Sequence, residues 1–367
     1  MTKFLHCADL HIDTKFQYLD EEKNTIRKEE LREVFSRIVS LAISEKVDVV
    51  FISGDLFEGV NATADSLELI TAEVLRAQNI RFFISPGNHD PYTPASQYTL
   101  LKLPSNAHIF SSTSIEKIVL DDLELEVYGA GFVTATCASN LLEGFVREPS
   151  GNASVYLIHG DIYNQGSPYN YMNPSEIERF GFDYVALGHV HAHSNDMYGK
   201  TRFVYPGIPE GRGFDELGDK GVVIGSISKG QTQIEFRPIS KRKYFVETFD
   251  VSPCDELGNI ASMIRNHEFE DSVSNFFKIV LNGVIDFEID VSALYEMICD
   301  YFYFLKIEDV TSAKIPENEY HEDSLRGIFL DKIHSELKNT TDENQKKLLT
   351  MAKNFGLAAL ERREIRR

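Results

Sequence analysis

Three short apolar runs, separated by two stretches with helical spacing, occupy the start of the chain and restrict its possible folds more than any other feature. The runs lie at 3–8, 47–53 and 80–85, and the second, VDVVFIS, has the β-branched composition of a buried strand. Between them, 29–46 and 62–78 repeat apolar residues at the three- and four-residue intervals of a helix. This β-α-β-α-β order predicts a layered α/β core.

The following segment, up to residue 240, is dominated by predicted strands. They are expected at 115–128, 155–159, 184–188, 203–205, 222–227 and 232–237. A short helix is expected at 173–180, with Asn173 as its cap and Pro174 at its first position. We therefore predict an α/β (α+β) fold in which a mixed two-sheet sandwich is flanked by helices.

The pattern changes near residue 240, where strands begin to alternate with short helices. This change predicts a separate small α/β domain, followed by a purely helical end. We expect three parts, at 1–240, 241–315 and 316–367.

Composition limits the class of protein. The 367 residues are 43% hydrophobic, enough for a sizeable core, and no apolar run is long enough to span a bilayer. The N-terminus lacks the basic-then-apolar pattern of a signal peptide, so a cytoplasmic protein without a membrane association is expected. Four scattered cysteines give no zinc knuckle or disulfide framework. The net charge of −20 argues against broad non-specific nucleic-acid binding, although bound divalent cations would supply local positive charge.

Polar side chains follow the strands of the predicted core at the points where the strands end. Carboxyl ends of strands in an α/β sheet meet along one edge and form the ligand crevice, so these side chains are expected to converge. Imidazole and carboxylate together suit first-row divalent metals. The candidate ligands are Asp9, His11, Asp55, Asn88, His159, His189 and His191. Seven ligands are too many for one ion with open positions, so two ions that share Asp55 fit better, as in hydroxide attack on phosphorus.

Each motif alone has an ordinary structural explanation. Asp9-Leu-His11 fits a turn with a surface histidine, Gly54-Asp55 is common turn chemistry, and the 87–90 stretch, GNHD, fits a loop with an Asx turn. His193 extends the last motif and is interpreted as a supporting or surface residue. The whole set in this order, each motif after a strand, favours the metal site.

The motif order DxH, GD, GNHD, H and GHxH resembles that of the calcineurin-like metallophosphoesterases over about residues 3–240. The resemblance implies that one metal is held by Asp9, His11, Asp55 and His191, and the other by Asp55, Asn88, His159 and His189. It also implies that His89 stabilises the transition state and protonates the leaving group, and that Asp90 orients His89.

Four longer segments are similar to the SbcD-like branch of that family, and most of all to its YhaO-type DNA repair exonucleases: FLHCADLHIDTKF, VVFISGDLFE, FGFDYVALGHVHAH and YPGIPEGRGFDELGDKGVVIG. The resemblance implies a Mn²⁺-dependent DNA nuclease, a 3′→5′ exonuclease in DNA repair, that forms a homodimer. It also implies a small cap domain and C-terminal helices that dock on an SMC-like coiled-coil ATPase of the SbcC type. An apolar stripe in 345–367 fits either that docking or packing on its own domain: Leu348, Ala352, Phe355 and Ala359.

The chain departs from the archaeal and eukaryotic relatives at one position. Three residues after the Asp55 carboxylate, those relatives carry a second catalytic histidine, whereas this chain has Glu58. Because the chain is acidic, DNA contacts would have to come from local patches, with Lys15, Arg212 and Lys220 as candidates, or from the ATPase.

Two other functions remain open from the sequence alone. The same metal ligands would serve a phosphoesterase acting on cyclic nucleotides or other small substrates, although such enzymes usually lack the cap and the C-terminal helices. A non-catalytic scaffold is the third reading, which the complete set of ligands disfavours.

Overall fold

The computed structural model describes residues 1–59, 62–313, 324–340 and 342–360. The chain divides into two compact units, Met1–Lys243 and Tyr244–Arg367. The predicted boundary between 315 and 316 lies outside the described residues, so the three-part division stays a prediction.

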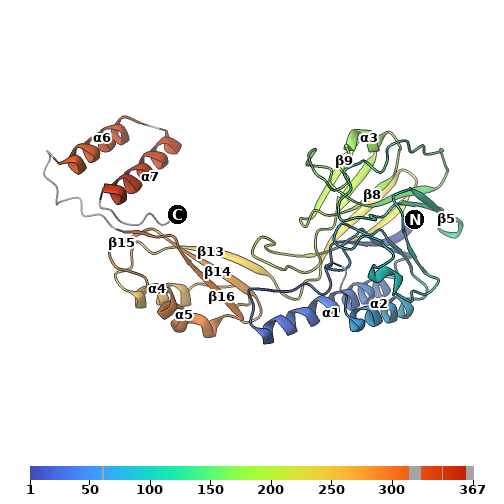
Figure 1. Ribbon diagram of the computed structural model, residues 1–367, viewed down its shortest axis with the longest axis horizontal. Coiled ribbons are helices and arrows are strands. Elements are labelled where there is room, and N and C mark those ends of the chain that lie inside the picture. Colours follow the sequence, from blue (N-terminus) through green and yellow to red (C-terminus); the bar gives the residue numbers. More distant parts are fainter. Residues whose placement is uncertain (60–61, 314–323, 341, 361–367) are drawn as a thin grey trace. The chain divides into compact units, whose positions relative to one another are not determined.

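The first unit contains two six-stranded sheets, coloured from blue to yellow in Figure 1. In the first sheet, β1 to β4 run parallel, and β11 and β12 extend it antiparallel on the side of β1. The strand order is β12 (Gln231–Pro238), β11 (Gly221–Ser228), β1 (Thr2–Cys7), β2 (Val49–Ile52), β3 (Arg81–Ile84) and β4 (Ala107–Ile109).

Two helices cover one face of this sheet, as Figure 1 shows. Helix α1 (Glu21–Glu45) begins eight residues before the predicted start, because the Asp20 side chain accepts a hydrogen bond from the Lys23 backbone N–H and caps a first turn of charged residues. Helix α2 (Ala64–Arg76) is capped by Thr63 in the same way. Apolar faces of both helices pack on β1, β2 and β3 to form one core.

The second sheet packs on the opposite face of the first. Residues of both sheets, including Phe4, Phe51, Leu157 and Ala186, make one buried cluster between them. The strand order is β5 (Glu116–Leu120), β6 (Leu125–Gly129), β7 (Ala153–His159), β8 (Tyr184–Gly188), β10 (Thr201–Tyr205) and β9 (Ser194–Tyr198). Helix α3 (Pro174–Glu178) begins with the predicted Asn173 cap. The predicted two-sheet sandwich with flanking helices is therefore confirmed.

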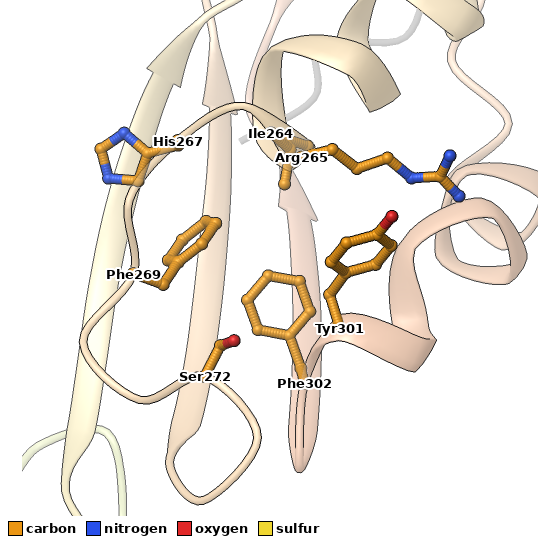
Figure 2. A pocket seen from close by; sticks show the side chains of 7 residues that line it. All are labelled: Ile264, Arg265, His267, Phe269, Ser272, Tyr301 and Phe302. Atoms are coloured by element: carbon orange, nitrogen blue, oxygen red, sulfur yellow. The ribbon is translucent and has the colours of Figure 1, made fainter.

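The second unit begins with a parallel three-stranded sheet, β13 (Tyr244–Asp250), β14 (Phe276–Asn282) and β16 (Phe304–Asp309). Helices α4 (Leu257–Arg265) and α5 (Val291–Ile298) pack on one face of it, and a strand pair, β15 (Val284–Ile285) and β17 (Ser312–Ala313), lies beside it (Figure 1). A cavity of about 90 Å³ opens between Phe269, Phe302 and Tyr301, with the Arg265 guanidinium over the Tyr301 ring (Figure 2). It is smaller than ordinary ligand pockets of about 300–1,000 Å³.

Two antiparallel helices, α6 (Leu325–Asn339) and α7 (Glu343–Leu360), follow in the second unit (red in Figure 1). Leu330 and Leu357 are buried, and Gly356 lies against the Phe329 ring. Leu348 and Phe355 of the predicted stripe are exposed instead. The basic end at 361–367 lies outside the described residues. None of the described helices has the length and apolarity needed to cross a membrane.

Candidate metal centre

The seven predicted ligands converge at the carboxyl ends of five strands from both sheets. His159 is the last residue of β7, and His189 follows β8 directly. Asp9, Asp55 and Asn88 come two to four residues after β1, β2 and β3. The two sheets therefore meet at this edge, and each contributes ligands to one crevice.

Several of these residues have an unusual backbone. Asp9, His11 and Asp55 have φ values of 54°, 46° and 50°, and His189 has 107°. Non-glycine residues rarely adopt this left-handed region, which costs about 1–3 kcal/mol per residue. The surrounding sheet holds these conformations: the Asp9 and His11 N–H groups donate to the carbonyls of Gly54 and Asp55. The folding of the sandwich thus maintains a strained crevice.

Close approach explains two of the glycines in the motifs. Gly54 has a φ of 90°, and a Cβ there would stand 2.3 Å from Nδ1 of His159. A Cβ on Gly87 would stand 2.2 Å from Oδ1 of Asp55. Only glycine leaves room for the ligands at these two places.

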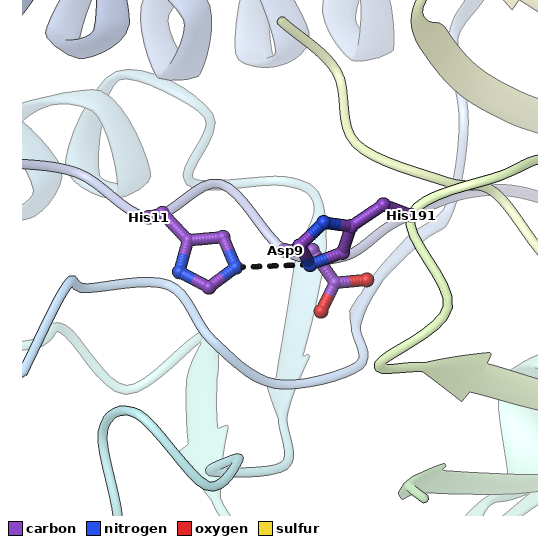
Figure 3. Close-up of side chains that lie close together, drawn as sticks. All are labelled: Asp9, His11 and His191. Carbon is purple, nitrogen blue, oxygen red and sulfur yellow. Dashed lines mark hydrogen bonds between the residues drawn. The ribbon is translucent and has the colours of Figure 1, made fainter. Parts of the chain in front are cut away.

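The first group of ligand atoms comes from Asp9, His11 and His191, which Figure 3 shows facing one another. One donor atom from each lies within 4.8 Å of the others. The Nε2 atoms of His11 and His191 are 3.4 Å apart, and Oδ2 of Asp55 is 3.8 Å from Nε2 of His11. These are the four residues expected to hold one metal.

The second group is built around Asp55 and His159. Oδ2 of Asp55 is 3.5 Å from Nε2 of His159, and Asp9 completes a group within 4.8 Å. The side-chain oxygen of Asn88 is 2.9 Å from Nε2 of His159 and 3.2 Å from Nδ1 of His189. Asp55 therefore lies between the two groups, as a shared ligand must.

Hydrogen bonds on the outer nitrogens fix the orientation of three histidine rings. Nδ1 of His11 is 2.7 Å from Glu58, and Nδ1 of His191 is 2.7 Å from Glu216. Nδ1 of His159 is 2.9 Å from the backbone carbonyl of Ser53. Since each partner is an acceptor, each Nδ1 carries the proton, and each Nε2 lone pair points into the crevice.

The chemistry of this donor set fits divalent cations. Burial lowers the pKa of His11 and His189 to about 4 and that of His159 to about 3, so the rings are neutral near pH 7. Burial and the neighbouring Asp55 raise the pKa of Asp9. Lone pairs of neutral imidazoles and carboxylate oxygens thus face one another at short distances, with surplus acceptors and too few protons between them. A cation would satisfy this arrangement.

The predicted pair His89 and Asp90 is not brought together as expected. Asp90 is fully buried; its carboxylate accepts the N–H groups of Gly87 and Phe57 at 2.7 and 3.1 Å and the Tyr98 hydroxyl at 2.6 Å. Burial and Asp55 raise the pKa of Asp90 to about 7. The carboxylate therefore braces the loop that carries Asn88, and the expectation that it orients His89 is corrected.

The ring of His89 instead contacts Glu58. Its Nδ1 lies 3.0 Å from Oε1 of Glu58, and the hydrogen bond to Glu58 raises the pKa of His89. Its side chain is 41% exposed, so it stands at the mouth of the crevice. The main-chain N–H of His89 donates to Asp55 at 2.9 Å, which ties the loop to the shared ligand.

Sequence reasoning missed Glu216 and the ring of Tyr169, which lies 4.8 Å from that of His189. Burial opposes ionisation of Glu216, but the hydrogen bond from His191 and the charge of Arg212 lower its pKa to about 2. The acidic residue in GRGFDE was the available signal. Arg212, suggested for DNA, contacts Glu58 and Glu216, whereas Lys15 is exposed and Lys220 half-buried.

His193 has the supporting role that its place in the motif allows. Its Nδ1 lies 2.9 Å from the Tyr205 carbonyl, and its ring stacks on Phe236 with centroids 4.6 Å apart. It thus packs the segment after the GHxH motif against β12.

Comparison with known proteins gives one family. The model of the calcineurin-like phosphoesterases matches residues 2–193. The uncharacterized metallophosphoesterase YhaO of Bacillus subtilis is 25% identical over 273 residues, covering 72% of this chain and 66% of YhaO. The DNA double-strand break repair protein Mre11 of Saccharolobus solfataricus is 31% identical over 201 residues, covering 52% of this chain and 50% of Mre11. That of Sulfolobus acidocaldarius is 24% identical over 397 residues, covering 96% and 98%.

The chain therefore spans less than two thirds of YhaO and half of the Saccharolobus Mre11. A dimetal phosphatase from Danio rerio is similar in structure, with a TM-score of 0.41 and 12% identity over 64% of this chain and 98% of that one. The family match covers more than half of this chain and includes all seven candidate ligands. The chain belongs to the calcineurin-like phosphoesterase family of metal-dependent enzymes.

Proposed function

We propose that this protein is a DNA nuclease that hydrolyses phosphodiester bonds with two divalent ions, Mn²⁺ as the native metal, and works as a 3′→5′ exonuclease in DNA repair. The observation that carries the proposal is the pair of ligand groups with Asp55 between them. Two adjacent cations are the usual device for in-line displacement at phosphorus. The names of the Mre11 relatives support DNA as the substrate.

The residue roles in this proposal follow the two groups. Asp9, His11, Asp55 and His191 hold one ion, and Asp55, Asn88, His159 and His189 hold the other. Asn88 ligates through its amide oxygen and adds no charge between two dications. When bound, the ions lower the pKa of a water molecule and neutralise the phosphate charge.

The remaining chemistry belongs to His89. Hydrolysis adds the oxygen of water to phosphorus and breaks one P–O ester bond, whose electron pair leaves with the ester oxygen. That oxygen needs a proton, because a sugar alkoxide is a poor leaving group. His89 stands at the mouth with one ring nitrogen held by Glu58, which leaves Nε2 to donate the proton.

A coiled-coil ATPase of the SbcC type is the proposed partner, with the α6–α7 hairpin as its docking site. Leu325 and Ile328 on α6, and Leu348 and Phe355 on α7, are exposed at helical spacings. Apolar side chains at such spacings suit the groove of a helical partner. The proposal also includes a homodimer and a cytoplasmic location, and the resemblance to the SbcD-like branch supports both.

Degradation of a labelled duplex tests the nuclease. Purified protein with Mn²⁺ is expected to shorten a 5′-labelled duplex from its 3′ ends, and His89→Ala to abolish the shortening. The matched control is His108→Ala, because His108 also pairs with a glutamate, Glu116, on the surface of the same unit. Hydrolysis of cyclic nucleotides with no cleavage of any DNA, alone or with the ATPase, would contradict the proposal.

A further inference from the structure

A pocket of about 660 Å³ lies in the first unit, at the end of the strands opposite the candidate metal centre. The candidate ligands come at or after the carboxyl ends of their strands, whereas this pocket lies where β2, β3 and β4 begin. Asp48 directly precedes β2, Arg81 is the first residue of β3, and Asn106 directly precedes β4. The volume is within the range of about 300–1,000 Å³ that is ordinary for ligand pockets. None of the seven candidate ligands lines it, so it is a separate hollow.

The pocket lies between the last strand of one sheet and the last strand of the other. β4 ends the first sheet and β5 ends the second, so each has one neighbour among the described strands. The sandwich is therefore open at this side, and we call the hollow the β4–β5 groove. Its lining includes Asp48, Arg81, His108, Ile118, Leu120 and Leu123.

The floor of the β4–β5 groove is apolar. Ile118, Leu120 and Leu123 are half-buried and pack against the cluster between the two sheets. Phe83, which is buried in that cluster, also lines the groove. An apolar side chain that enters the groove from outside would therefore continue the core of the sandwich and leave water.

Two polar contacts join the edges of the groove. Arg81 on β3 pairs with Asp122, which follows β5, at 2.7 Å. Nε2 of His108 on β4 lies 3.0 Å from Oε2 of Glu116 on β5. Because each contact reaches from one sheet to the other, the two edges are held at a fixed spacing and the groove is preformed.

The main chain of β5 offers hydrogen bonds along one side. β5 pairs antiparallel with β6, and its other side meets no strand of the described chain. Free N–H and C=O groups on such an edge are a template for pairing with another extended chain. An open edge beside an apolar floor is the arrangement that binds a peptide by strand addition.

Charge determines which peptide fits the groove. Asp48 and Asp122 line it, and Glu116 adjoins it through the contact with His108. The side chains of Asp122 and Glu116 are 60% and 50% exposed, so both carboxylates remain accessible to a cation from outside. The guanidinium in the lining, that of Arg81, is already paired with Asp122. This rim is complementary to lysine and arginine and repels the phosphates of nucleic acid.

We propose that the β4–β5 groove binds an extended basic segment of a partner protein, which adds to β5 as a further strand. Apolar side chains in the middle of the segment cover Ile118 and Leu120, and lysine or arginine side chains at its ends reach Asp122 and Glu116. Because the groove lies at the opposite end of the strands from the candidate ligands, this binding is independent of the metal and of the substrate hydrolysed there.

A synthetic peptide serves as the probe. It has Val-Thr-Val-Thr-Val at its centre, because β-branched residues favour a strand, and two lysines at each end. Fluorescence anisotropy of the labelled peptide with the full chain should give a dissociation constant in the micromolar range. One control peptide carries glutamates in place of the lysines. The other is N-methylated at alternate residues, which keeps its charge and apolar side chains but removes the N–H donors of one edge. Both should bind more weakly by about tenfold or more.

Hydrogen exchange locates the peptide. The amides of 116–120 should exchange more slowly when the lysine peptide is bound, since an added strand takes up the free groups of this edge. The N-methylated peptide should leave their exchange unchanged. Protection confined to other strands would overturn the assignment to β5.

Two variants of the groove test the contacts. Asp122→Asn should lower the affinity for the lysine peptide by about two- to fivefold, the effect of one surface charge pair. Ile118→Thr keeps a β-branched side chain but makes the floor polar, and should lower the affinity by about tenfold. The matched control is Glu235→Gln, because Glu235 also pairs with an arginine, Arg237, on the edge strand β12 of the first sheet. Thermal midpoints and Mn²⁺-dependent hydrolysis of bis(p-nitrophenyl) phosphate should remain those of wild type in all three variants.

The outcomes separate strand addition from simpler attraction. Equal affinity for the N-methylated peptide, or equal losses in Glu235→Gln and Asp122→Asn, would overturn the proposal, since general attraction to a chain of net charge −20 would then explain the binding. No binding of the lysine peptide would overturn it as well. Slow exchange at 116–120 that needs no peptide and increases with protein concentration would assign this edge to a second copy of the chain and overturn the partner segment.

Discussion

Two clusters of buried charge lie in the same unit and are built in opposite ways. The first is the candidate metal centre; the second, here called the Arg27 network, joins α1 to the segment after β10 and to the end of the unit. Its members are Arg27, Glu30, Arg37, Glu210, Lys241 and Arg242. Arg27 and Glu210 are as deeply buried as four of the candidate ligands: Asp9, His11, Asp55 and His159.

The difference lies in what faces each acceptor. Glu210 accepts from the guanidinium groups of Arg27 and Arg37, both at 3.0 Å, and from the N–H groups of Lys241 and Arg242 at 2.6 and 3.1 Å. In the candidate metal centre, by contrast, imidazole nitrogens and carboxylate oxygens that all act as acceptors face one another. A buried carboxylate that meets donors on every side needs no ligand from outside, whereas a cluster whose lone pairs face one another is prepared for one.

The largest expected effect comes from the shared ligand. Asp55→Asn keeps the shape and an oxygen for the His89 N–H, but removes the negative charge between the two ligand groups. We expect phosphodiesterase activity to fall below detection, while the free energy of unfolding of the metal-free protein, measured in urea, stays at that of wild type or rises, because a buried charge that faces other acceptors is removed. A large loss of metal-free stability would show that the two clusters are alike.

The opposite result is expected in the Arg27 network. Glu210→Gln removes the carboxylate that Arg27 shares with Arg37 and leaves Arg27 with Glu30 as its remaining charge partner. Breaking a buried pair costs about 3–5 kcal/mol, which is the upper limit expected here. Urea unfolding of the metal-free protein measures this loss. Mn²⁺ affinity of the variant, measured below its unfolding transition, should remain that of wild type; a weakened site would show that the network also shapes the metal centre.

Strand-end positions made the convergence of the seven candidate ligands predictable from the sequence. An apolar run fixes where a strand ends, and parallel pairing brings the ends of β1, β2 and β3 to one edge. The predicted strand 115–128 is divided into β5 and β6, and the division has a local cause in the sequence. Asp121 and Asp122 begin a short 3₁₀ turn, and Glu124 follows with a φ of 50°.

The partners of the ligands were not predictable in this way. Glu58 reaches His11 across 47 positions and Glu216 reaches His191 across 25, so no local pattern pairs them. Neighbouring positions in the sequence gave a wrong partner for His89. Asp90 is next to His89 in the chain, but its carboxylate accepts from the Tyr98 hydroxyl and two backbone N–H groups. Side-chain direction after a strand depends on backbone φ, which sequence alone did not give at these residues.

Added metal should stabilise the folded chain through the candidate metal centre and not through the Arg27 network. An ion that binds the folded chain at 100 times its dissociation constant adds about 2.7 kcal/mol to the free energy of unfolding. Mn²⁺ should therefore raise the unfolding midpoint of wild type and of Glu210→Gln by similar amounts. Asp55→Asn is expected to gain much less; an equal gain in Asp55→Asn would mean that the ions bind elsewhere.

The smallest expected effect concerns His6, a buried histidine that is not among the candidate ligands. His6 on β1 has both ring nitrogens satisfied by hydroxyls, with Nδ1 2.9 Å from Tyr184 and Nε2 2.7 Å from Ser53. Burial lowers the pKa of His6 to about 3, so protonation favours the unfolded chain. Stability from the neutral ring is complete above the ordinary pKa of about 6.5 and is lost as the pH falls below it.

The expected slope is about 1.4 kcal/mol per pH unit for this one proton, between its unfolded and folded pKa values. His6→Gln should lower stability at pH 7 but flatten the acid limb of the unfolding curve by one proton. Urea unfolding at pH 7, 6 and 5 with the metal-free proteins measures the difference between the two slopes. Because both ring nitrogens of His6 contact hydroxyls and His6 is not among the candidate ligands, Mn²⁺ should stabilise the variant at pH 7 as much as wild type. Equal slopes in the two proteins would mean that His6 accepts a proton in the folded protein, and that burial does not lower its pKa.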